Sequence, residues 1–307
     1  MMPDFFIVGA ARSGTTSLDL YLSQHPEIYI THRKETHFFA GDALPPRFTG
    51  PGDERLNALL IRDAEQYARL FADTRGAKIA GEASAFYLCY PEAALRIKQA
   101  VPDAKILIIL REPVERTYSA YMMLVRDGRE RASLEEGLQR EKERREKDFE
   151  PMWWYTELSL YYRQVKHYLD VFGSQQVKVL LYEEFYAQPE QALRDIFAFL
   201  GVRQDISIDT SVRYNISGAP KSRRLYNVLD QFMFNPGPLE KRLKALVPLN
   251  LRMAWASKLI GMSVERVGLD AGLRALLKTC FARDVEQLAD LLKRDLSCWH
   301  YQQSSIV

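Results

Sequence analysis

The feature that most constrains the fold is a short apolar run followed at once by a glycine-spaced loop. Residues 5–8 form a continuous run of bulky apolar side chains, the pattern of a buried parallel strand, and Gly9 ends it. The loop reads Gly9-Ala10-Ala11-Arg12-Ser13-Gly14-Thr15-Thr16, which has the glycine spacing of a phosphate-binding P-loop. Leu18 and Leu22 predict that a helix follows directly. Small residues let backbone N–H groups converge on an anion at the positive end of that helix, so the sequence predicts an anion site here.

Further apolar runs over 106–110 and 177–182 predict two more central strands, which we expect to be neighbours of the first in one sheet. Helical periods over 165–172 and 193–200 alternate with these strands. This alternation predicts an α/β fold with three layers, in which helices flank a central parallel sheet. The breakers beyond Arg213 divide a mostly helical C-terminal region. No linker-like stretch separates two halves, so residues 1–307 are expected to form a single domain with helical additions at its C-terminal end.

The charge balance excludes several classes of partner. The 307 residues carry 42 Lys and Arg against 40 Asp and Glu, a net charge of +2, so nucleic acid is not an expected partner. Any anion site must be local. Three dispersed cysteines, Cys89, Cys280 and Cys298, lack the spacing of a disulfide framework or a zinc site. We therefore expect a cytoplasmic protein without a metal, and the first apolar run is too short for a signal peptide or transmembrane segment.

Four other stretches have a structural and a functional interpretation, and the structural one is favoured for each. Residues 126–150 mix charges at helical spacing, which indicates a solvated helix held by i,i+4 ion pairs. The basic run 32–34 is interpreted as solvated surface rather than an acceptor contact. The aromatic residues 153–155 are interpreted as core rather than acceptor contacts. The apolar face of residues 249–262 is interpreted as core packing rather than membrane contact.

A cation stands at the end of the second predicted strand. Arg111 occupies the place where a phosphate-hydrolysing P-loop enzyme usually carries a magnesium-binding Asp. Pro113 starts a helix that places Ser119 two turns along, so Arg111 and Ser119 can grip one further anion. Thr15 stands where P-loop nucleoside triphosphatases carry Lys, which disfavours an ordinary ATPase or kinase. Two anion sites on one sheet indicate a nucleotide with separated phosphates.

With these motifs the sequence resembles the sulfotransferases that use 3′-phosphoadenosine 5′-phosphosulfate (PAPS), in the branch of heparan sulfate and bacterial carbohydrate or lipid sulfotransferases. Residues 11–16 look like the 5′-phosphosulfate loop of that family, and Arg111 with Ser119 looks like its 3′-phosphate pair. The segment Lys34-Glu35-Thr36-His37-Phe38-Phe39 looks like the one that carries the catalytic base. Residues 215–223 look like the basic loop that closes over the nucleotide.

The resemblance implies a set of site residues. PAPS, with the desulfated nucleotide PAP as product, is expected to bind to Ala11, Arg12, Ser13, Gly14, Thr15, Thr16, Ser17, Arg111, Ser119, Lys221, Ser222 and Arg223. Glu35 is the expected general base for a hydroxyl acceptor, with His37 as the competing base. Arg12 is expected to stabilise the transition state by charge. The acceptor is a hydroxyl on a glycan, a lipid or a small metabolite, and nothing in the sequence indicates an oligomeric state.

Two departures from the family pattern keep alternatives open. Arg12 stands where the family usually has Lys, and Ala83 stands where the heparan enzymes have a second Lys. Arginine keeps the charge but does not hand over a proton, because its pKa is very high. A P-loop kinase and a catalytically inactive nucleotide-binding relative are therefore the two alternative hypotheses.

Overall fold

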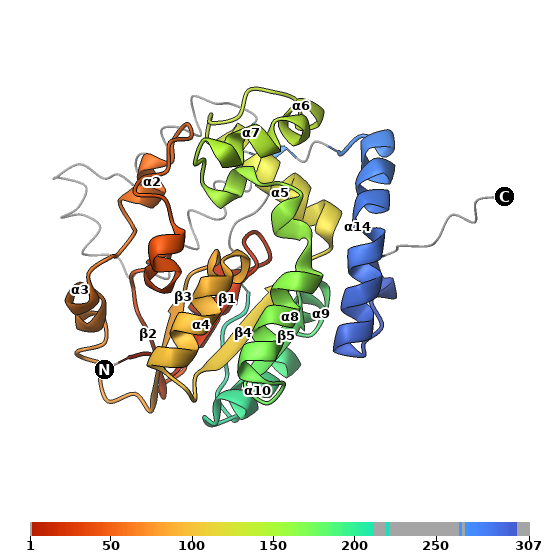
Figure 1. Ribbon diagram of the computed structural model, residues 1–307. Coiled ribbons are helices and arrows are strands. Elements are labelled where there is room, and N and C mark those ends of the chain that lie inside the picture. Colours follow the sequence, from red (N-terminus) through yellow and green to blue (C-terminus); the bar gives the residue numbers. More distant parts are fainter. Residues whose placement is uncertain (1, 212–218, 221–263, 266–267, 300–307) are drawn as a thin grey trace.

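The central element of the computed structural model is a five-stranded sheet with the strand order β2-β3-β1-β4-β5 (Figure 1). The structure describes residues 2–211, 219–220, 264–265 and 268–299. Every pair of neighbouring strands in this sheet is parallel. The three strands predicted from the sequence, β1, β4 and β5, lie side by side as expected. The strands of the sheet are β1 (Phe5–Gly9), β2 (Ile28–Ile30), β3 (Ile79–Ala83), β4 (Lys105–Leu110) and β5 (Val177–Leu181).

Helices and short 3₁₀ turns (η) connect these strands. The larger helices are α1 (Thr15–Leu22), α4 (Pro91–Ala100), α5 (Pro113–Arg126), α8 (Tyr161–Phe172), α10 (Pro189–Leu200) and α14 (Ala271–Leu292). The shorter ones are α2 (Glu54–Asn57), α3 (Ala64–Arg69), α6 (Leu134–Gln139), α7 (Glu141–Glu146) and α9 (Tyr182–Ala187). The 3₁₀ turns are η1 (Phe38–Ala43), η2 (Tyr87–Cys89), η3 (Pro151–Trp153), η4 (Glu157–Ser159) and η5 (Ser297–Trp299), and a second, antiparallel pair joins β6 (Ala219–Pro220) to β7 (Val264–Glu265).

Alternate residues of each central strand face opposite layers of helices, which is why these strands read as continuous apolar runs. Phe6 and Val8 of β1 share one core with residues of α4 and α8. Phe5 and Ile7 share the other core with residues of α1 and α10. Figure 1 shows α4 and α8 in front of the sheet, and α14 packs against α8 and α5. The predicted three-layer α/β fold with a helical C-terminal addition is confirmed.

Two strands were not predicted from the sequence. β3 reads Ile-Ala-Gly-Glu-Ala and lacks a run of bulky apolar residues, because Phe5 of β1 packs directly over Gly81 and fills the space that a side chain would take. β2 has only three residues. Within the described part of the chain, no helix has the length and apolar character needed to cross a membrane. Residues 249–262 lie outside that part.

The charged segment was expected to be one solvated helix, and this expectation is wrong. The segment forms two short helices, α6 and α7, and the Arg144 side chain is buried in an ion pair with Glu130 at 2.7 Å. Two i,i+4 pairs on α7 do lie at the surface, as expected. The helical charge pattern could not show that Arg144 also packs over the ring of Trp153, whose predicted burial in the core is confirmed.

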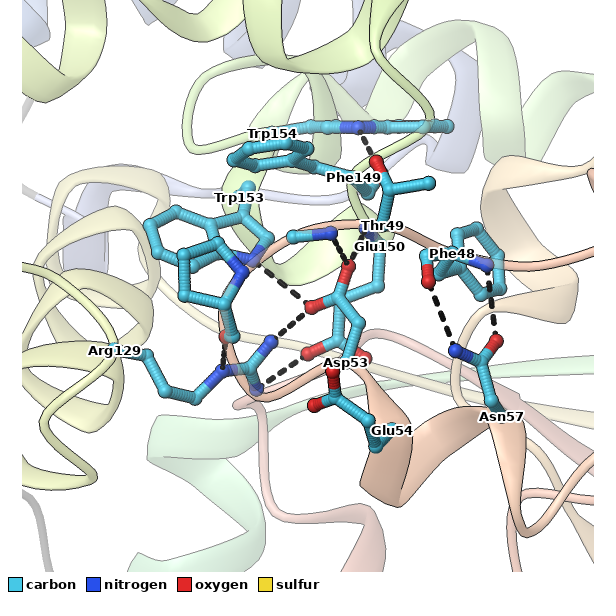
Figure 2. A network of polar contacts seen from close by, with 12 residues as sticks. Phe48, Thr49, Asp53, Glu54, Asn57, Arg129, Phe149, Glu150, Trp153 and Trp154 are labelled. Carbon is cyan, nitrogen blue, oxygen red and sulfur yellow. Dashed lines mark hydrogen bonds and ion pairs between the residues drawn. The ribbon is translucent and has the colours of Figure 1, made fainter.

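A second buried polar network holds the segments on one side of the molecule together (Figure 2). Asp53 is fully buried, and its Oδ2 accepts hydrogen bonds from the backbone N–H groups of Gly50 at 2.8 Å and Glu150 at 2.9 Å. Its Oδ1 accepts from the indole N–H of Trp153 at 3.1 Å and from the guanidinium of Arg129. One carboxylate therefore joins the loop before α2, the turn after α5 and the start of η3.

Asp53→Ala is expected to lower the free energy of unfolding by about 3 kcal/mol, because it leaves buried donors and the Arg129 charge without this partner. The matched control is Asp42→Ala, which removes the exposed partner of Arg96 at 2.9 Å and is expected to cost about 0–1 kcal/mol. Urea unfolding of both variants measures the difference. Equal losses in the two variants would contradict a structural role for the Asp53 network.

Candidate active site

A cleft of about 710 Å³ lies at the edge of the sheet where the carboxyl ends of β1, β3 and β4 meet. The loops after parallel strands converge at this edge, which is where α/β proteins usually bind ligands. Eight of the residues predicted from the sequence line this one cleft. They are Ala11, Arg12, Gly14, Thr15, Thr16, Glu35, Arg111 and Ser119.

The glycine-spaced loop leads into α1 through a glycine in the left-handed region. Gly14 has a φ of 97°, in the left-handed region, and stands directly before the first residue of α1. A Cβ atom at Gly14 would lie 3.2 Å from the ring of Tyr182, so both the conformation and the close approach require glycine. The fully buried Arg116 donates from Nε to the carbonyl of Ala11 at 3.1 Å. This bond ties the loop to α5.

Arg12 connects the two predicted anion sites. Its Nε donates to the hydroxyl oxygen of Ser119 on α5 at 3.1 Å. Burial and the nearby charges of Arg126 and Arg111 lower the pKa of Arg12 to about 9, so the group is still charged at pH 7. Cations packed this closely repel one another, and an anion bound among them removes that cost. The charge distribution therefore favours an anionic ligand.

Arg111 follows the last residue of β4 and lies on the same wall of the cleft. Its NH2 is 3.6 Å from Oε2 of Glu115, and its guanidinium carbon is 4.9 Å from the centre of the Tyr182 ring. Arg274 of α14 pairs with the same Glu115 at 2.8 Å. One carboxylate thus orients two guanidinium groups, and this wall keeps a net positive charge.

Glu35 lies at the opposite side of the loop, held by the segment that follows β3. Its backbone N–H donates to the carbonyl of Ala83 at 3.0 Å, and its Oε2 accepts from the N–H of Ala85 at 2.8 Å. The side chain keeps 28% exposure and lines the cleft. Burial raises the pKa of Glu35, but the hydrogen bond and charge of His37, with Lys34 and the Ala85 amide, bring that pKa below its ordinary value. Glu35 is therefore a carboxylate at neutral pH.

His37 lies behind Glu35 rather than on the cleft. Its ring is buried, stacks on Phe86 at 5.1 Å, and has Nε2 3.2 Å from Oε2 of Glu35. Between the two residues, Thr36 bonds to the fully buried carboxylate of Glu82, which also accepts from Tyr67 at 2.5 Å. A buried carboxylate satisfied by hydroxyl groups fixes the backbone on both sides of Thr36. The direction of the Glu35 side chain is therefore set by the tertiary structure.

Two predicted site residues that the structure describes, Ser13 and Ser17, do not line the cleft. The side chains of both are buried, and Ser17 accepts a hydrogen bond from Tyr186 at 2.7 Å. Ser13 is part of the loop and Ser17 is part of α1, but the side chain of neither residue reaches the cleft. The predicted Lys221, Ser222 and Arg223 lie outside the described residues. Within the described residues, no group of three or more His, Cys, Asp or Glu side chains is placed to hold a metal ion.

Two residues at the site were missed or misread from the sequence. Lys34 was interpreted as solvated surface, yet its Nζ donates to Oγ1 of Thr16 at 3.3 Å and lies 3.7 Å from Asp19. Its position next to Glu35 was the only available signal. Arg116 was not singled out at all, although it occupies an inward-facing position of α5, where an arginine is rarely placed without a partner.

Comparison with solved structures identifies close relatives of this architecture. A sulfotransferase from Alicyclobacillus acidocaldarius is 45% identical, with 98% of this chain and 99% of that chain covered and a TM-score of 0.78. The sulfotransferase domain from the curacin biosynthetic pathway is 15% identical over 96% of this chain and 99% of its own, with a TM-score of 0.50, and so is similar in fold.

Curated relatives match shorter parts of the chain. The membrane-associated sulfotransferase kil1 of Dictyostelium discoideum is 33% identical over 123 residues, 39% of this chain and 22% of that protein. Human heparan sulfate glucosamine 3-O-sulfotransferase 3B1 is 23% identical over 206 residues, 67% of this chain and 48% of the relative. The matches therefore span less than half the length of these two relatives.

A family model and a full-length structural relative both assign the chain to one family, and this assignment agrees with the motifs in the cleft. A model described as "Sulfotransferase family" matches residues 3–205, which include the glycine-spaced loop, Glu35, Arg111 and Ser119. The full-length similarity to the Alicyclobacillus enzyme points the same way. The chain belongs to the sulfotransferase family.

Proposed function

We propose that this protein transfers a sulfuryl group from PAPS to a hydroxyl acceptor, with Glu35 as the general base. The observation that carries the proposal is the hydrogen bond from Arg12 to Ser119, because it joins a phosphosulfate loop and a 3′-phosphate pair in one cleft. Glu35 lies on the wall of the same cleft. A donor with phosphates at both ends of its ribose fits two adjacent cationic sites better than a linear triphosphate does.

The charges of the cleft support this donor. Arg12, Arg111 and Arg126 all line the cleft, and the pKa of Arg12 is lowered by burial and by the nearby charges of Arg126 and Arg111. Arg274 adds a further cation beside Glu115. A nucleotide that carries a 3′-phosphate and a 5′-phosphosulfate brings several negative charges to this cluster. The loop amides at the start of α1 offer the uncharged donors that complete such a site.

Each residue of the site has a separate role in the proposed sulfuryl transfer. Glu35 accepts the proton of the acceptor hydroxyl as the new O–S bond forms, while the S–O bond to the 5′-phosphate breaks. PAPS supplies the sulfuryl group, and PAP leaves with the bonding electrons. Arg12, Thr15 and Thr16 hold the charge that develops on the leaving phosphate, and Arg111 with Ser119 holds the 3′-phosphate. His37 positions the Glu35 carboxylate and keeps it ionised.

Arg111→Ala is expected to weaken PAP binding by about 10–100-fold, because it removes charge-assisted hydrogen bonds to a phosphate. Calorimetric titration with PAP measures the change, and ATP with magnesium serves as the comparison nucleotide. The matched control is Arg203→Ala, since Arg203 is exposed and pairs only locally with Asp205 at 2.9 Å. If the wild-type protein does not bind PAP, or binds ATP with magnesium more tightly, the proposed function is wrong.

We also propose that residues 1–307 form one domain and that the protein acts in the cytoplasm. The three cysteines are free in the structure, and Cys280 and Cys298 are exposed, which suits a reducing compartment. Limited proteolysis tests the first proposal, since a stable fragment much shorter than the chain would contradict it. Cell fractionation of the untagged protein tests the second.

A further inference from the structure

The cleft continues well beyond the proposed donor site, along one face of α5. Ser119, Met122, Met123 and Arg126 all line it, and their spacing of three, four and seven residues places them on one side of the helix. At a rise of about 1.5 Å per residue, Arg126 lies roughly 10 Å beyond Ser119. Glu35 lines the same cleft, so we expect the acceptor hydroxyl to enter through this outer part.

The walls of the outer cleft are mainly apolar. The apolar side chains that line the cleft include Met122 and Met123 of α5, Leu56 of α2, Leu59 just after α2, Phe86 and Met152. Leu59 keeps 39% exposure, which is unusual for a large apolar side chain in this protein. Contiguous exposed apolar surface commonly marks a binding site, and methionine side chains adapt to ligands of varied shape. This part of the cleft is therefore suited to the body of an apolar molecule.

Arg129, which lines the cleft, is paired with two carboxylates (Figure 2). Arg129 donates from NH1 to Glu150 at 2.6 Å and from NH2 to Asp53, so two carboxylates oppose this one guanidinium. Arg126 pairs with Asp127 at 3.1 Å. Arg129 and Arg126 are therefore already paired with carboxylates before any acceptor binds.

The donor end differs, because there Arg12 lies near other cations. An acceptor that carries sulfate or carboxylate groups would have to compete with Asp53 and Glu150 for Arg129, and it would meet the negative charge of Glu35. Burial raises the pKa of Glu150 to about 7, so near neutrality this carboxyl can donate or accept a hydrogen bond. A neutral hydroxyl or carbonyl is the partner that such a group binds without a charge penalty.

We propose that the outer cleft is the acceptor site and that it takes an uncharged alcohol with an apolar body, in preference to an anionic glycan. The inference rests on the proposed sulfuryl transfer, since Glu35 and the donor site define where the hydroxyl must lie. The apolar body packs between α5 and the end of α2, and Leu59 is a specificity-determining contact at the entrance.

The test compares two acceptor probes on protein saturated with PAP. 2-Naphthol represents the uncharged apolar alcohol, and an N-sulfated heparan-type tetrasaccharide represents the anionic glycan. Binding is measured by calorimetry for the wild type, for Leu59→Asp and for the matched control Leu95→Asp, which changes another exposed leucine, on α4. Leu59→Met serves as the conservative variant.

The proposal expects 2-naphthol to bind the wild type more tightly than the tetrasaccharide does. Leu59→Asp should weaken 2-naphthol binding about tenfold or more, while Leu95→Asp and Leu59→Met stay within about twofold of the wild type. Tighter binding of the tetrasaccharide, no binding of 2-naphthol, or equal affinity in Leu59→Asp and wild type would each overturn the proposal. Failure of PAP itself to bind would instead overturn the proposed function, so the two failures are distinguishable.

Discussion

Glu35→Gln is expected to lower kcat for sulfuryl transfer by about 10³-fold, because the amide cannot accept the proton of the attacking hydroxyl. The affinity for PAP should not change, since Glu35 contacts the acceptor side of the cleft and not the cluster of arginines. Initial rates with PAPS and a hydroxyl acceptor measure the first quantity, and calorimetric titration with PAP measures the second. Loss of turnover with retained nucleotide binding is the specific signature of a missing base.

The matched control for this change is Glu65→Gln, which alters an exposed carboxylate on α3 that pairs with Arg69. The pH profile adds a second check. The pKa of Glu35 is already below its ordinary value of about 4.3, so ionisation of Glu35 should not limit kcat/KM between pH 5 and pH 8. Replacing His37 with Phe keeps the stacking on Phe86 but removes two influences that lower this pKa. The acidic limb of the profile should then move to higher pH.

These outcomes separate the two candidate bases. Unchanged kcat in Glu35→Gln would contradict the role of Glu35 and return the base to His37 or to solvent. A shifted acidic limb with a nearly normal plateau in His37→Phe would show that His37 acts through Glu35. A plateau reduced by about 10³-fold in His37→Phe, with Glu35→Gln active, would reverse the assignment.

Arg12→Ala is expected to lower kcat/KM by about 10²–10³-fold, because in the proposed mechanism the variant loses the charged donor to the leaving phosphate. Arg12→Lys keeps the charge but loses the fixed donor to Ser119, so we expect it to fall between Arg12→Ala and the wild type. Steady-state kinetics with varied PAPS measures both variants.

The control for the Arg12 variants is Arg194→Ala, which removes a guanidinium on α10 that donates to the neighbouring Gln191 at 2.9 Å. This variant should keep wild-type kinetics. A kcat/KM in Arg12→Ala within tenfold of the wild type would contradict the role of Arg12 in the transition state. It would also favour Lys34, which contacts Thr16 at 3.3 Å, as the cation that serves the loop.

Local sequence patterns were sufficient to predict the three central strands and the loop before α1. The apolar runs of β1, β4 and β5 predicted three neighbouring parallel strands, because strands buried on both faces are apolar at most positions. The glycine spacing predicted the loop before α1, because only glycine readily adopts the left-handed conformation found at Gly14. Arg111 and Ser119 were recognisable because their separation along one strand end and helix is itself local.

The tertiary structure alone decided which side chains of residues 34–37 reach the cleft. Glu35 and His37 are two residues apart and were both candidates for the base, yet one faces the cleft and the other is buried behind it. That choice depends on Ala83, Ala85 and Glu82, which approach from a different part of the chain. The same holds for Arg144 and Lys34, whose charges predicted solvent exposure. Burial of a charged group depends on a partner far away in the sequence, and the folded chain brings that partner into contact.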